Sequence, residues 1–160
     1  MERLFTIGAY GFDAERFFAA LEEAKVDLFL DLRRRRGVRG REYAFANAGR
    51  LMEELEARGI RYRHVLDLAP DNETRELQSR ADKADRVARR KREALSDAFV
   101  ADYTTRTLDP FDLEGLIAEL KVFSRPTLFC VERTPQACHR GLVADRLAKV
   151  AGVPVTHLVP

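Results

Sequence analysis

A group of residues near the C-terminal end could carry chemistry, because it combines two thiols, an imidazole, a carboxylate and a guanidinium. The group consists of Cys130, Glu132, Cys138, His139 and Arg140. Thr134 and Pro135 predict a helix start, which puts Cys138 in the first turns, where the helix dipole favours anions and lowers the pKa of a thiol. Cys138 and His139 are therefore candidate catalytic residues, and Glu132 and Arg140 candidate anion-binding residues. The alternative is that Cys138 is a small core residue and that His139 and Arg140 are surface side chains.

A second group occupies residues 31–41, where an acid precedes a run of basic residues. The run holds Arg33, Arg34, Arg35, Arg36, Arg39 and Arg41, with two glycines between them. Strand alternation places Asp31 and Arg33 on the same side of the chain. Asp31 is a candidate general base, metal ligand or orienter of Arg33, and Arg33, Arg36 and Arg39 are candidate anion ligands. The alternative is a solvated basic loop.

Three other sites are less well supported by the sequence. Residues 8–11 join a predicted strand to a helix but lack a dinucleotide or P-loop pattern, so we predict a tight structural turn. The possible metal ligands lack the spacing of a structural zinc site, and no metal or other cofactor is expected. These possible ligands are Cys130, Cys138, His139, His64 and His157. A cysteine phosphatase needs Cys-x₅-Arg, yet Ala144 and Gln136 stand six positions after the two cysteines.

Strands alternating with helices predict the elements that would position these residues. Short apolar runs predict strands at residues 4–7, 26–32, 60–66, 127–131 and 153–159. Helical spacing predicts helices after Asp13, Asn47, Asp109–Pro110 and Thr134–Pro135, and Gly59 and Gly152 suit helix ends. The fold class is α/β, a three-layer Rossmann-like fold with a mostly parallel central sheet of about five strands. In such folds ligands bind at the carboxyl ends of strands, where both groups lie.

Residues of about 70–107 are mostly charged helix formers and predict a helical insertion. Ser96 or Asp97 could begin its second helix. With 160 residues and no linker, we expect one domain over residues 1–160.

Composition limits the other functional classes. The net charge is only +2, so bulk attraction to nucleic acid is not implied. Two cysteines are too few for a disulfide framework, and no segment is typical of a signal peptide or membrane span. We expect a cytoplasmic protein with reduced thiols and no membrane partner.

These motifs together resemble the family called domain of unknown function 488. The resemblance rests on Thr6-Ile7-Gly8, Asp31-Leu32-Arg33 with its basic loop, residues 59–64, Cys130-Val131-Glu132, Cys138-His139-Arg140 and His157-Leu158. It implies a Rossmann-like domain but no established reaction. It also implies that Asp31, Arg33, His64, Cys138, His139 and Arg140 form one site. The insertion is longer than in compact members of the family.

Two functions remain open at this level. The first is an enzyme with an anion-binding site that acts on a phosphorylated small molecule, a nucleotide or a nucleic-acid end. The second is a non-catalytic nucleic-acid-binding module that uses the arginine-rich loop and the basic residues around Arg86–Arg92. Only Tyr43 and Phe45 follow the arginine run, so aromatic residues for base stacking are few.

Overall fold

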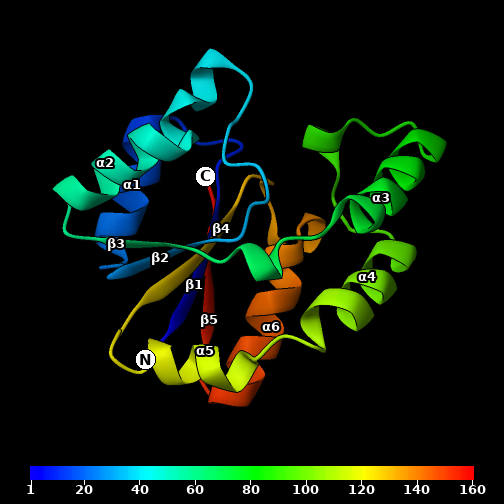
Figure 1. Ribbon diagram of the computed structural model, residues 1–160. Helices are drawn as coiled ribbons and strands as arrows, with labels where there is room; N and C mark the ends of the chain where they lie inside the picture. The colour runs from blue at the N-terminus through cyan, green and yellow to red at the C-terminus, as the bar shows by residue number, and fades with distance from the viewer.

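The computed structural model describes residues 1–160, with five parallel strands in the order β3-β2-β4-β1-β5 (Figure 1). Every neighbouring pair of strands is parallel. The strands are β1 (Leu4–Gly8), β2 (Leu28–Asp31), β3 (Arg61–His64), β4 (Pro126–Cys130) and β5 (Val155–Leu158). The predicted α/β fold is therefore confirmed, and each strand overlaps its predicted position.

Helices cover both faces of the sheet and bury alternate residues of each strand. One face carries α1 (Ala14–Glu23) and α2 (Ala48–Ala57), which pack on Phe29 and Phe129. The other carries α5 (Leu113–Leu120) and α6 (His139–Ala151), which pack on Leu30 and Leu128. These are the three layers of a Rossmann-like fold.

The predicted insertion folds as helices between β3 and β4. It contains α3 (Asn72–Ala84), a 3₁₀ turn at Arg89–Lys91, α4 (Asp97–Tyr103) and a π-turn at Thr104–Leu108. Phe99 and Tyr103 of α4 are buried in the same core as α5 and α6. In Figure 1 the insertion extends beyond α6 to one side of the sheet. None of the helices combines the length and apolarity needed to cross a bilayer.

Most helix ends follow the predicted capping chemistry. Asp13 and Ser96 accept backbone N–H bonds as N-caps, and Gly59 and Gly152 have positive φ angles. Asn47 stands at the predicted N-cap of α2, but its Oδ1 accepts from Val38 N instead of the helix.

Two predicted helix starts are wrong. The helix expected from Asp109–Pro110 begins at Leu113, because residues 104–108 continue α4 as a π-turn and Asp112 caps α5. Thr134–Pro135 begins only a short 3₁₀ turn, Pro135–Ala137. The α6 helix then starts at His139, with Cys138 as its N-cap residue.

Candidate functional site

The strand connections open a crevice beside β4. The chain leaves β1 and β2 toward α1 and α2, whereas it leaves β4, which lies between them, toward α6 on the opposite face. Neighbouring strands whose connections diverge in this way form the switch point at which α/β folds bind ligands. The chain after β2 carries Arg33, and the chain after β4 carries Glu132 and Cys138.

A cavity of about 910 Å³ occupies this crevice. Its walls come from the ends of β1, β2 and β4, the arginine loop (residues 33–41), α3 and the 85–95 segment of the insertion. Eight arginines and one lysine line it, against three carboxylates. The cationic residues are Arg33, Arg34, Arg35, Arg39, Arg75, Lys83, Arg89, Arg90 and Arg92. The cavity is therefore strongly electropositive.

Some of these arginines have carboxylate partners and others have none. Arg34, Arg35, Arg39 and Arg75 make no ion pair. Arg34 donates only to the backbone carbonyls of Pro70 and Ala69. Burial, and then the positive charges of Arg89, Arg35 and Arg34, lower the pKa of Arg75. Cations from the arginine loop and from α3 thus converge without a compensating acid.

Cys138 and His139 lie at the floor of the cavity and are both buried. Nε2 of His139 lies 3.1 Å from the backbone carbonyl oxygen of Leu32. A carbonyl can only accept, so Nε2 carries the proton and donates to it. Nδ1 therefore presents its lone pair to Sγ of Cys138, 3.8 Å away. A thiol, an imidazole and a backbone carbonyl are aligned as nucleophile, base and orienter are in thiol enzymes.

Cys130 completes this floor and changes the ionisation of Cys138. Sγ of Cys130, Sγ of Cys138 and Nδ1 of His139 all lie within 4.8 Å of one another. Burial alone would raise the pKa of Cys138, but a hydrogen bond from Cys130 and the positive charge of Arg140 hold it well below its usual value. The hydrogen bond to Cys138, together with burial, raises the pKa of Cys130.

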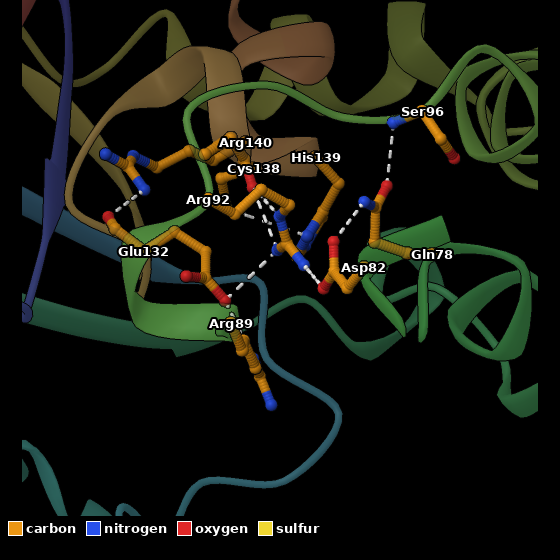
Figure 2. Close-up of polar contacts among 10 residues, drawn as sticks. Gln78, Asp82, Arg89, Arg92, Ser96, Glu132, Cys138, His139 and Arg140 are labelled. Atoms are coloured by element: carbon orange, nitrogen blue, oxygen red, sulfur yellow. Dashed lines mark hydrogen bonds and ion pairs between the residues drawn. The ribbon is translucent and has the colours of Figure 1, made fainter. Parts of the chain in front are cut away.

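Glu132 connects the floor to the insertion, as Figure 2 shows. Its Oε1 accepts from Arg89 Nε at 2.8 Å and lies 3.3 Å from Arg92 NH2. Arg92 also pairs with Asp82 of α3 at 2.8 Å and donates to the carbonyl of Ala137. Burial raises the pKa of Glu132, while Arg89 and Arg92 oppose that shift. Glu132 thus holds the 85–95 segment over the cavity.

Asp31 and Arg33 form a buried pair. Arg33 donates to both carboxylate oxygens at 2.8 and 2.7 Å, and to the carbonyl of Ala46. The Asp31 carboxylate also accepts from the Arg33 backbone N–H and from the Tyr62 hydroxyl. Of the three roles considered for Asp31, this arrangement fits the orienter of Arg33. As a general base Asp31 would have no free lone pair, and it does not line the cavity.

Some of the residues predicted from the sequence to form the site line the cavity, and others do not. Arg140 is fully buried and donates to the carbonyls of Glu132 and Arg133, so its guanidinium is committed to the turn before α6. Arg36 bonds Tyr62, and His64 bonds the backbone carbonyl of Arg33. Neither lines the cavity, whereas Arg33, Arg39, Glu132, Cys138 and His139 do.

Sequence reasoning missed the contribution of the insertion. The sequence does not single out Arg75, and it groups Arg89 and Arg92 with the basic residues that could bind a polymer. In the fold, all three face the cavity. The only signal in the sequence was the density of arginine in the insertion, which does not indicate which way the side chains point.

Comparison with known proteins gives one match. A family model described as "Domain of unknown function DUF488" matches residues 13–147. No curated protein and no solved structure matches the chain. The matched residues include the arginine loop, the insertion and the Cys130–Arg140 region.

Proposed function

The chain belongs to the DUF488 family, whose description assigns no activity, and we propose from the geometry of the cavity that it binds a phosphate-bearing ligand there. The ligand class is a phosphorylated small molecule, a nucleotide or a nucleic-acid end. The proposed role is that of an enzyme, because the side chains able to do chemistry lie at the cavity floor.

One observation carries the proposal, the convergence of Arg34, Arg35 and Arg75 without acidic partners. Like charges that face one another across a partly enclosed space repel, and the lowered pKa of Arg75 reflects that repulsion as well as burial. A bound anion would relieve it. Guanidinium forks match phosphate oxygens and bind them through paired hydrogen bonds.

The shape of the cavity favours a ligand of small-molecule size. Its volume of about 910 Å³ falls in the range of small-molecule and cofactor sites. The arginines line a concavity that the 85–95 segment partly covers, through bonds to Glu132 and to the carbonyl of Arg39. A polymer-binding strip would instead present its cations along an open surface.

The floor provides the reactive groups. Cys138 is aligned with the lone pair of His139, and both line the same cavity as the arginines. A phosphate held by Arg34, Arg35 and Arg75 would place the rest of the ligand within the space above them. Cys138 and His139 are therefore the residues we propose to act on it.

Calorimetry with pyrophosphate and adenosine diphosphate tests binding. Wild-type protein is expected to bind one equivalent, and Arg75→Gln is expected to bind about 10-fold to 100-fold more weakly, as for loss of a charged hydrogen bond. Arg80→Gln is the matched control, because Arg80 lies on the same helix, pairs with Glu76 and does not line the cavity. Equal binding by all three proteins, or none by wild type, would reject the cavity as the anion site.

A salt titration with single- and double-stranded oligonucleotides tests the alternative. We expect weak oligonucleotide binding beside tight nucleotide binding. Tight polymer binding with a steep salt dependence, and no nucleotide binding, would support the nucleic-acid module instead.

A further inference from the structure

Three donor atoms from two parts of the chain converge at the cavity floor. Cys130 is the last residue of β4, and Cys138 and His139 form the start of α6. The two sulfurs and Nδ1 of His139 lie within 4.8 Å of one another, and the three residues are 6%, 2% and 6% exposed. The sequence spacing of the cysteines gave no indication of a metal site, so the convergence arises from the fold.

The histidine is oriented as metal-binding histidines are. Its Nε2 donates to the carbonyl of Leu32, the residue directly after the neighbouring strand β2. Histidine ligands almost always donate their second ring nitrogen to a carbonyl or carboxylate, which fixes the ring and the tautomer. Here that bond leaves the Nδ1 lone pair directed at Sγ of Cys138.

The separation between Cys138 Sγ and His139 Nδ1 matches a tetrahedral metal site. Zinc–sulfur and zinc–nitrogen bonds of about 2.3 and 2.05 Å place neighbouring ligand atoms about 3.6 to 3.8 Å apart. The observed distance from Cys138 Sγ to His139 Nδ1 is 3.8 Å. Cys130 Sγ lies at most 4.8 Å from the other two donors, so an inward movement of about 1 Å or less would complete three corners of a tetrahedron.

A disulfide between the cysteines explains less of this arrangement. It would need the sulfurs to approach to about 2.05 Å, and it would leave the histidine lone pair without a role. Soft thiolates with an imidazole are instead the donor set that selects zinc. Two thiolates also balance the charge of a divalent ion in a buried position.

We propose that Cys130, Cys138 and His139 form a three-ligand zinc site whose fourth position opens into the arginine-lined cavity. All three residues line that cavity, so water or a ligand atom can reach the open position. Three protein ligands with one open position is the arrangement of catalytic rather than structural zinc sites. The site rests on the donor geometry alone and does not depend on anion binding. With zinc bound, Cys138 and His139 would be metal ligands in place of the nucleophile and base described above.

Cobalt titration of reduced, metal-free, full-length protein tests the site. We expect one equivalent of Co²⁺ to bind with thiolate-to-cobalt charge-transfer absorption and the visible bands of a tetrahedral site, both lost on addition of Zn²⁺. We expect zinc binding to weaken by at least about 10-fold in each of the variants Cys130→Ser, Cys138→Ser and His139→Gln. Loss of a residue that only hydrogen-bonds a metal ligand already weakens metal binding by about 10-fold to 100-fold. His64→Gln and His157→Gln are controls, because these histidines bond Arg33 and Thr6 elsewhere.

A second measurement keeps the test decisive if a buried cysteine variant fails to fold. In wild-type protein, one equivalent of Zn²⁺ should protect both thiols from iodoacetamide. Absence of the charge-transfer band, or zinc binding that leaves the thiols unprotected, would overturn the proposal. Rapid disulfide formation with no cobalt band would overturn it too and identify a redox pair. None of these readouts requires phosphate, so failure here is distinct from failure of the anion site.

Discussion

Arg89 Nε donates to Oε1 of Glu132 at 2.8 Å and so joins the helical insertion to the chain that follows β4. Glu132 is buried, whereas Arg89 is more than half exposed. The 85–95 segment has no fully buried residue, and polar contacts hold it in place. Such segments open locally at low free-energy cost. The Glu132 contact therefore controls how firmly the cavity is covered.

Replacement of Glu132 by Gln is expected to loosen the segment. The variant loses the charged acceptor for Arg89 and Arg92. A hydrogen bond to a charged group contributes about 1.5–3 kcal/mol of stability, so the contact between the segment and Glu132 weakens. Limited trypsin digestion should cut after Arg86 to Arg92 about 10-fold faster than in wild type. Glu42→Gln is the control, because its 3.4 Å pair with Arg90 is exposed and should matter little. Equal cleavage of Glu132→Gln and wild type would show that Glu132 does not hold the cover.

Replacement of Asp31 by Asn is expected to destabilise the fold. Both members of its pair with Arg33 are almost fully buried, so the variant leaves an uncompensated guanidinium inside. Breaking such a pair costs about 3–5 kcal/mol, measured as the free energy of unfolding in urea. Glu119→Gln removes an exposed pair with Arg63 and should cost less than about 1 kcal/mol. A loss below about 1 kcal/mol for Asp31→Asn would contradict a structural role for the pair.

Gly8 is expected to tolerate no side chain. A Cβ at this position would overlap the backbone carbonyl oxygen of Glu132, in the turn that Arg140 also contacts. Gly8→Ala should lower the unfolding free energy by at least about 1–3 kcal/mol, the usual cost of overpacking. Gly49→Ala, in open space on α2, should be neutral or slightly stabilising. Equal melting temperatures for the two variants would show that the approach of β1 to the turn after β4 is looser than described.

The sequence was sufficient to predict the sheet and to place the chain after β2 and after β4 at the same edge of it. Apolar runs and capping residues such as Asp13 report local structure, and the parallel order then brings the chain after β2 and β4 together. The sequence was insufficient where one side chain could have either a binding role or a structural role. Arg33 and Arg140 have the residue type of anion ligands. In the fold, however, Arg33 donates to the carbonyl of Ala46, distant in the sequence, and Arg140 donates to the carbonyl of Glu132 in the turn after β4.

The arginines of the insertion were missed because the sequence does not show which way a helix faces. Arg75 and Arg89 lie in a charged region with weak apolar periodicity, so the sequence predicts helices but not the face they present. The packing of Phe99 and Tyr103 in the core with α6, and the bonds of Arg89 and Arg92 to Glu132, turn the insertion toward the strand ends. The helix start predicted at Pro110 was wrong for a local reason. The π-turn that precedes Pro110 has no clear signal in the sequence.

The most direct measurement is a crystal grown with tungstate, a phosphate-like anion whose anomalous scattering marks its position. We predict an anomalous peak within hydrogen-bond distance, about 3 Å, of guanidinium nitrogens of Arg34, Arg35 or Arg75. The peak should be absent from Arg75→Gln crystals and present in Arg80→Gln crystals grown in the same way. An empty cavity beside tungstate bound elsewhere on the surface would contradict the proposed anion site, and the arginines would then be a solvated face.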